Sequence, residues 1–264
     1  MKKHNFSAGP SILPKSVIEQ SAKGVLNINN SNLSLIEISH RSKDFVEIMN
    51  NATALALDLL NLQNKGYKAL FLQGGASMQF LMTAYNLLEN KAGYINTGAW
   101  STKAMKEAKN FGEVIEIASS KDANFNYIPK DYKLLEDLDY LHITSNNTIY
   151  GTQYKNFPII GNNNSFLVAD MSSDILSSPL DISKFGLIYA GAQKNMGPAG
   201  VTLVIIRSDL LDLNYRDIPT MMRYSTHASK DSMYNTPPVL SVCVVNAVSY
   251  THLRAHETLR YLVC

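Results

Sequence analysis

The chain has 264 residues, which is enough for one large core or two smaller domains. Apolar residues make up 45% of it and charged residues 17%, as in ordinary globular proteins. The 24 Lys and Arg residues nearly balance the 22 Asp and Glu residues, so nothing indicates a nucleic-acid partner. No apolar run approaches the roughly 20 residues of a membrane-spanning helix, and no secretory signal opens the chain. The two cysteines indicate neither a disulfide framework nor a metal site, and a cytoplasmic protein is expected.

Short β-rich runs alternate with amphipathic stretches along the chain. Strands are predicted at 67–72, 92–96, 113–117, 140–144, 166–170, 186–190 and 201–207. Helical patterns lie at 45–62, 77–89 and 101–111. This alternation predicts an α/β fold of three layers, in which helices cover both faces of a mainly parallel seven-stranded sheet. In such sheets ligands bind beyond the carboxyl ends of the strands.

Lys194 lies in the stretch YAGAQKNMGPAG (189–200), between two apolar runs. Taken alone, the stretch is typical of a surface turn with a solvated lysine, because lysines are mostly exposed. Its small neighbours, however, leave space for a ligand beside the side chain.

The pair Gly74 and Gly75 follows the first predicted strand and precedes a helix expected to begin near Ala76 and Ser77. Glycine backbones and the positive end of a helix together can hold a phosphate. A purely structural turn is an equally good interpretation of this pair. The stretch is neither a P-loop nor the glycine fingerprint of dinucleotide-binding folds.

Two further residues are expected at the same edge of the sheet. Asp170 ends the predicted strand 166–170, and Trp100, the only tryptophan, follows the strand 92–96. Each has an ordinary interpretation, as a turn acid or as a packed indole. Together with Lys194 and the glycine pair they fit pyridoxal phosphate, which needs a phosphate cradle, a stacked aromatic ring, a carboxylate at its ring nitrogen and a Schiff-base lysine. Desolvation would favour the neutral, nucleophilic amine of Lys194.

The sequence resembles the phosphoserine aminotransferase family, which belongs to the class V aminotransferases of fold type I. Its motifs recur in the family's order as FSAGPSILP near the start, EISHRSKDF (37–45), QGGASMQF (73–80), NTGAW (96–100), ADMSSDILS (169–177), YAGAQKNMGPAG (189–200) and YNTPP (234–238). The resemblance extends from about residue 4 to about residue 243.

The resemblance implies a role for each matching residue. Lys194 would be the catalytic lysine, Asp170 would pair with the pyridine nitrogen, and Trp100 would stack on the ring. Thr148 would contact the ring hydroxyl, and the remaining cofactor-binding residues would be Ala76, Ser77, Gln193, Asn235 and Thr236. The last two would reach the phosphate of the neighbouring subunit's cofactor, which implies a homodimer with shared active sites.

His40 and Arg41 would bind substrate, and a guanidinium suits this role because it grips carboxylate or phosphate at two points. The implied reaction transfers the amino group of L-glutamate to 3-phosphohydroxypyruvate, giving O-phospho-L-serine and 2-oxoglutarate in serine biosynthesis. A related phosphorylated hydroxythreonine of vitamin B6 synthesis is a second substrate in the family.

The resemblance stops after the stretch NTPPVLSVCVV (235–245). Residues 1–246 are interpreted as the cofactor-binding large domain with its N-terminal segment, and the family's small C-terminal domain as largely missing. Residues 247–264 include SYTHLRAHET, which resembles a peptide found at the ends of translated metagenomic reads, so this tail is expected to be non-native. The alternative is a genuine, divergent C-terminal helix. Because part of the substrate site would be lost, weak cofactor binding and poor turnover are expected.

Three other functions stay open at this point. Another class V enzyme, such as an alanine–glyoxylate aminotransferase or a cysteine desulfurase, would differ in very few residues, although neither Cys243 nor Cys264 lies in a convincing nucleophile loop. A nicotinamide-dependent oxidoreductase is disfavoured because Tyr189 and Lys194 lack the Tyr-x-x-x-Lys spacing. A non-catalytic cofactor-binding or dimerising fragment is the third.

Overall fold

The computed structural model describes residues 3–160, 165–213 and 215–261, and only the backbone of residues 252–261. Its main sheet has seven strands in the order β1-β9-β8-β7-β4-β2-β3. The strands are β1 (Tyr67–Leu72), β2 (Lys91–Asn96), β3 (Glu113–Ser119), β4 (Tyr140–Thr144), β7 (Phe166–Asp170), β8 (Phe185–Gly191) and β9 (Thr202–Arg207). Strand β9 runs antiparallel to both of its neighbours, β1 and β8, so the other six strands all point the same way. The predicted mainly parallel seven-stranded sheet is confirmed, with strand ends within two residues of those expected.

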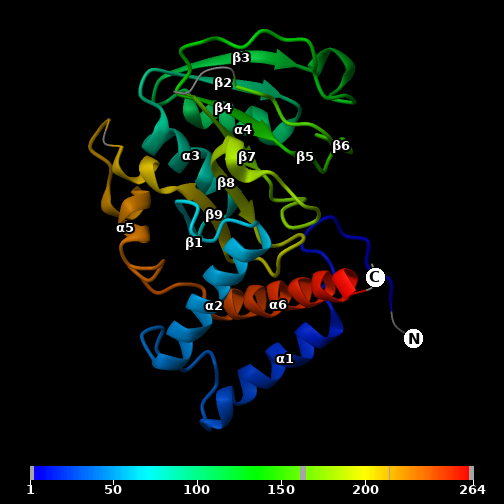
Figure 1. Cartoon of the computed structure of the whole chain (residues 1–264), viewed down its shortest axis with the longest axis vertical. Coiled ribbons are helices and arrows are strands. Elements are labelled where there is room, and N and C mark those ends of the chain that lie inside the picture. Colours follow the sequence, from blue (N-terminus) through cyan, green and yellow to red (C-terminus); the bar gives the residue numbers. More distant parts are fainter. Residues whose placement is uncertain (1–2, 161–164, 214, 262–264) are drawn as a thin grey trace.

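Helices cover both faces of the sheet (Figure 1). The α-helices are α1 (Lys15–Leu26), α2 (Lys43–Leu59), α3 (Gly75–Leu87), α4 (Ala99–Ala108), α5 (Tyr224–Ala228) and α6 (Val239–Tyr261). Helices α1, α2 and α6 lie side by side, and α2 and α6 pack on one face, whereas α3, α4 and α5 pack on the other. The three-layer arrangement is confirmed.

Short elements that the sequence analysis does not predict connect these layers. The strands β5 (Asn146–Asn147) and β6 (Thr152–Gln153) form a small hairpin after β4. The 3-10 helices are η1 (Ile28–Asn30), η2 (Lys121–Ala123), η3 (Ile182–Lys184), η4 (Ser208–Asp212) and η5 (Thr220–Met222). The hairpin matters for the site because it carries Thr148 in its turn.

Local chemistry sets the helix starts. Ser42 caps α2 by accepting a hydrogen bond from the backbone N–H of Phe45, and Asp44 places negative charge in the first turn. Gly74 precedes α3 with a φ of 91°, a left-handed conformation in which a Cβ would lie 2.5 Å from that of Met78. Only glycine fits at this turn, so the sharp exit from β1 into α3 depends on it.

The central strands are buried on both faces, as parallel strands covered by helices must be. In β7, Leu167 and Ala169 pack toward α2, and Phe166 and Val168 pack toward α3 and α4. By the same alternation Asp170 lies on the α3 and α4 side, at the carboxyl end of the strand. The strands β1, β2, β3, β4, β7 and β8 point the same way, so their following loops all leave from one edge of the sheet.

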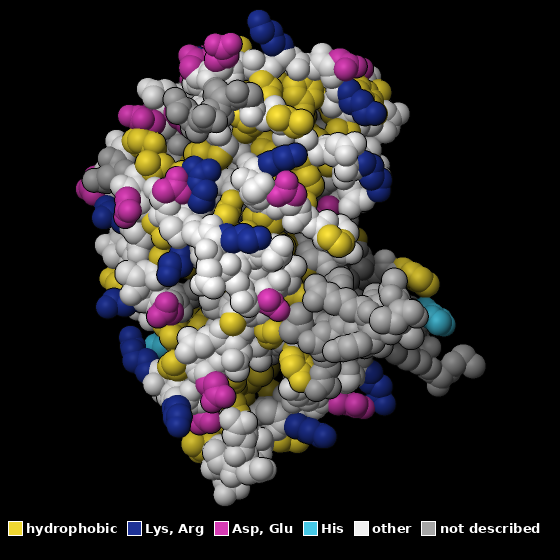
Figure 2. All heavy atoms as spheres, in the orientation of Figure 1, with side chains coloured by type: hydrophobic (Ala, Val, Ile, Leu, Met, Phe, Trp, Pro, Cys, Tyr) yellow, Lys and Arg dark blue, Asp and Glu magenta, His cyan; other side chains and the backbone are white. Residues whose placement is uncertain are grey.

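Charges of both signs are scattered over the face shown in Figure 2, between exposed apolar side chains. This distribution agrees with the near balance of charge in the sequence. Among the described residues, no helix has both the length and the apolarity that crossing a membrane requires.

Helix α6 continues without a break across residue 247. Ala247 and Val248 are buried against Val244 of the same helix and Val17 of α1. The side chains of residues 252–264 lie outside the described part of the chain, and the non-native origin of residues 247–264 stays a prediction.

Gly186 in β8 offers a test of this packing. A Cβ at this position would lie 2.2 Å from the ring of Phe166 and 2.8 Å from Leu210 Cδ1, so Gly186→Ala should destabilise the fold by about 1–3 kcal/mol through overpacking. Gly24 in α1 has open space around its Cβ position, so Gly24→Ala should stabilise the protein by about 0.5–1 kcal/mol. Urea unfolding of both variants measures the difference, and equal midpoints would contradict the described core.

Candidate functional site

Lys194 lies in the connection between β8 and β9, at the edge where the parallel strands end. The backbone of this connection is closed by hydrogen bonds from Ala192 N to Val201 O (3.0 Å) and from Gly197 N to Ala192 O (2.8 Å). The half-buried Nζ donates to Thr148 Oγ1 at 2.5 Å and to Ser173 Oγ at 2.7 Å. Lys194 is therefore held at the edge of the sheet and is not a solvated surface lysine.

The two hydroxyls that hold Lys194 come from different loops and also contact each other, at 2.6 Å between Thr148 Oγ1 and Ser173 Oγ. Desolvation lowers the pKa of Lys194 from its ordinary value, while the nearby carboxylates of Asp170 and Asp174 act in the opposite direction. Because desolvation is the largest cause, the neutral amine is more accessible here than on an exposed lysine.

Asp170 is buried at the end of β7 with an exposed fraction of 5%. Its Oδ1 accepts a hydrogen bond from Ser172 N at 3.0 Å and a second one from Ser172 Oγ at 2.6 Å. Desolvation raises the pKa of Asp170, and the two bonds from Ser172 and the charge of Lys194 oppose this rise. A carboxylate buried in this way needs positive or donating partners to stay ionised.

A second acid, Asp174, lies near enough to Lys194 to affect its pKa. It accepts hydrogen bonds from Ser145 Oγ at 2.5 Å and from Gln153 Nε2 at 3.0 Å. The run MSSD follows Asp170 in the sequence, but no role is predicted for Ser172, Ser173 or Asp174. The sequence does contain a signal for these roles. Four apolar residues of β7 are followed by Asp170 and, after Met171, by three polar residues in a row.

Trp100 lies in the first turn of α4, after β2. Its indole Nε1 is buried and has no hydrogen-bond partner among the described residues, and Lys103 Nζ lies 4.6 Å from the centre of its ring. The preceding loop is tied to the β5–β6 hairpin, because Thr97 Oγ1 donates to Asn147 Oδ1 at 3.0 Å. The loop of Trp100 and the loop of Thr148 are thus held together at one edge of the sheet.

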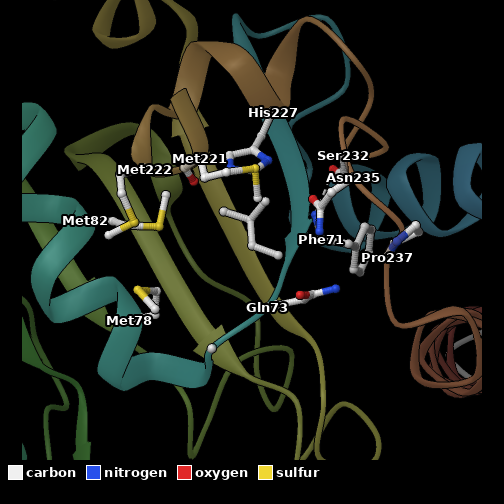
Figure 3. Close-up of a pocket in the computed structure, with 12 residues that line it drawn as sticks. Phe71, Gln73, Met78, Met82, Met221, Met222, His227, Ser232, Asn235 and Pro237 are labelled. Carbon is white, nitrogen blue, oxygen red and sulfur yellow. Dashed lines mark hydrogen bonds between the residues drawn. The ribbon is translucent and has the colours of Figure 1, made fainter. Parts of the chain in front are cut away.

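Ala76 and Ser77 lie in the first turn of α3, where the backbone N–H groups have no partners within the helix. Asn235 and Thr236 approach this turn from the segment before α6, since Gln73 Nε2 donates to Thr236 O at 2.8 Å. Figure 3 shows Asn235 and Gln73 at one end of a pocket whose other end is lined by methionines. This cavity of about 310 Å³ includes Met78, Met82, Met221 and Met222 in its lining.

Gln193 and Lys194 are covered by the N-terminal segment. Ser11 N donates to Gln193 O at 3.0 Å, and Ser11 Oγ donates to the backbone oxygen of Lys194. Gly9 is packed so closely that a Cβ there would lie 3.0 Å from Lys194 Cγ.

No described contact joins His40 and Arg41 to the Lys194 region. Both lie in the loop before α2, where the Arg41 side chain is exposed and His40 Nε2 is buried without a described partner. The structure joins Lys194 to Thr148 and places it near Asp170, whereas the two predicted substrate residues lie in a separate loop.

Comparison with known proteins identifies the family of the chain. The model of the family described as aminotransferase class-V matches residues 3–256. The phosphoserine aminotransferase of Flavobacterium johnsoniae is 60% identical over 246 residues, which are 92% of this chain and 68% of that protein.

Two solved structures are similar over the same region. A phosphoserine aminotransferase studied for radiation damage of its Schiff base is 50% identical, with a TM-score of 0.90 over 95% of this chain and 70% of that one. The pyridoxal phosphate-bound phosphoserine aminotransferase of Trichomonas vaginalis is 35% identical, with a TM-score of 0.89 over 96% of this chain and 71% of that one.

These matches disfavour the oxidoreductase and desulfurase interpretations and agree with the predicted fold type. The chain belongs to the phosphoserine aminotransferase family of the class V aminotransferases.

Proposed function

We propose that this chain is a pyridoxal phosphate-dependent aminotransferase that transfers the amino group of L-glutamate to 3-phosphohydroxypyruvate and so produces O-phospho-L-serine. One observation carries the proposal. Lys194 Nζ donates hydrogen bonds to the hydroxyls of Thr148 and Ser173, and it lies close enough to Asp170 for the carboxylate charge to affect its pKa. A desolvated lysine beside a buried carboxylate is the pair that this cofactor requires.

The residues of the site fit the cofactor chemically. Asp170 Oδ2 accepts no described hydrogen bond, so it can receive one from a protonated ring nitrogen. The first turn of α3, with Ala76 and Ser77, offers N–H donors toward an anionic group. When bound, pyridoxal phosphate supplies an aldehyde that condenses with amines and a ring that withdraws electrons.

Each residue of the chain then has a defined task. Lys194 holds and returns a proton at Nζ, which requires the neutral amine that desolvation favours. Thr148 and Ser173 fix the direction of that nitrogen. Asp170 would pair with the ring nitrogen, and Gln193 would lie near the phosphate. His40 and Arg41 bind the carboxylate and phosphate of the substrate, for which the fork of a guanidinium is suited.

A homodimer with shared sites is the second part of the proposal. Among the described residues, the Asn235 side chain makes one long hydrogen bond, 3.4 Å to Thr236 O, so its amide is available to a neighbouring subunit. In this arrangement Asn235 and Thr236 would contact the phosphate of the partner's cofactor. The cytoplasmic location and activity toward phosphohydroxythreonine stay predictions.

The lysine can be tested by covalent labelling. Protein incubated with pyridoxal phosphate and reduced with borohydride should carry the added mass on Lys194, and Lys194→Ala should lose it. The rate of attachment should rise with pH through a midpoint below the ordinary lysine value of 10.5, because desolvation lowers the pKa of Lys194. Peptide mass spectrometry locates the label, and labelling at a surface lysine such as Lys15 would contradict the assignment.

Arg41 can be tested through substrate affinity. Arg41→Ala removes a charge-assisted contact, so KM for phosphoserine should rise by roughly tenfold or more, with little change in melting temperature because the side chain is exposed. The nearby variant Lys43→Ala serves as control and should leave KM within about twofold. The wild-type protein should also prefer phosphoserine to alanine as amino donor, and the reverse order would favour an alanine–glyoxylate type enzyme.

The shared site can be tested by mixing subunits. Lys194→Ala and Asn235→Ala proteins should each be impaired alone. Co-expressed, they should regain activity, because one site of each mixed dimer then combines an intact Lys194 with the partner's intact Asn235. If Asn235 served its own subunit, no site would be intact and mixing would restore nothing.

A further inference from the structure

Ser172 lies between the ends of two neighbouring strands and uses both of its polar groups there. Its N–H and its hydroxyl donate to the same atom, Asp170 Oδ1, at 3.0 and 2.6 Å. Its Oγ in turn accepts a hydrogen bond from Gly191 N, at the end of β8, at 3.0 Å. Because the hydroxyl already accepts from Gly191, its single proton is directed at the carboxylate. Ser172 itself is only 7% exposed.

These contacts fix the carboxylate in one orientation. Both described hydrogen bonds to Asp170 end at Oδ1, which leaves Oδ2 without a described donor. The anchor is rigid because Ser172 is tied to β8 as well as to β7. A carboxylate with one oxygen anchored and the other open presents a single acceptor to whatever binds beside it.

The same local motif occurs a second time, at the surface. Ser183 donates to Asp181 Oδ1 from its N–H at 3.1 Å and from its hydroxyl at 2.6 Å. There the two bonds hold the pKa of Asp181 below its ordinary value, because desolvation of this exposed carboxylate is a smaller effect than the hydrogen bonds. At Asp170 the same pair opposes a desolvation that is larger than its own effect. The chain thus contains a matched control for the buried motif.

We propose that Ser172 is a positioning residue, which anchors Asp170 through Oδ1 and reserves Oδ2 for the ring nitrogen of the cofactor. This inference rests on the proposed function. Ser172 touches neither substrate nor cofactor in this assignment, and its effect passes entirely through the carboxylate.

The experiment measures the affinity of the 264-residue protein for pyridoxal phosphate by quenching of the single tryptophan, Trp100, over a series of pH values. Ser172→Ala should weaken binding at pH 7 by roughly tenfold, the loss of one hydrogen bond to a charged group. Removing that donor raises the pKa of Asp170 further. The acid form has no negative charge with which to stabilise a protonated ring nitrogen, so the low-pH loss of affinity should move to higher pH.

Two comparisons separate positioning from a general structural effect. In an Asp170→Asn background, Ser172→Ala should change the affinity by less than about twofold, because the group it acts through is gone. Ser183→Ala, the surface control, should change neither the affinity nor its pH dependence. If Ser172→Ala fails to fold by circular dichroism, Ser172→Cys, which is close in size and a weak donor, takes its place with the same expectation.

The outcomes are distinguishable. Equal losses in both backgrounds, or an effect of Ser172→Ala no larger than that of Ser183→Ala, would overturn the inference while leaving the proposed function intact. Failure of the wild-type protein to bind the cofactor, or unchanged affinity in Asp170→Asn, would overturn the proposed function itself.

Discussion

The buried charge of Asp170 is the constraint on which the rest of the site depends. A carboxylate with 5% exposure costs free energy unless donors and an opposite charge surround it. The structure meets this need with Ser172 on one side and the positive charge of Lys194 on the other. Burial affects the lysine as well. It lowers the pKa of Lys194, so the ammonium group is easier to deprotonate. Burial at this edge therefore favours the neutral amine of Lys194 but opposes the charge of Asp170, which its hydrogen-bond donors must stabilise.

The sheet makes this pairing possible at little cost to the core. Asp170 follows four apolar residues of β7, all of them buried, and its polar partners lie in loops just beyond the strand ends. The polar groups are thus confined to the edge, while Val168 and Leu187 beneath them pack like any parallel-sheet core. The antiparallel β9 completes the sheet and returns the chain after Lys194, so the lysine lies in a loop that is anchored at both ends.

Much of this could be predicted from the sequence, because the signals are local. Apolar runs of five to seven residues marked the strands, and the glycine pair at 74–75 marked the turn into α3. Parallel topology then placed Lys194, Asp170 and Trp100 at a common edge without any knowledge of side-chain geometry. The supporting residues could not be found in the same way. Ser172 and Ser173 differ in role only because successive residues point in different directions, one toward Asp170 and the other toward Lys194.

The lysine connection also depends on residues from the far end of the chain. Ser11 contacts the backbone of Gln193 and Lys194, across a separation of 183 residues between Ser11 and Lys194. Contacts between such distant residues form slowly, because the long intervening loop must first be closed. During synthesis the N-terminal segment leaves the ribosome first, yet its partner is made only after most of the sheet. The N-terminal residues are thus made first but form their contacts with Gln193 and Lys194 late. Those contacts are complete only when nearly the whole domain has been made.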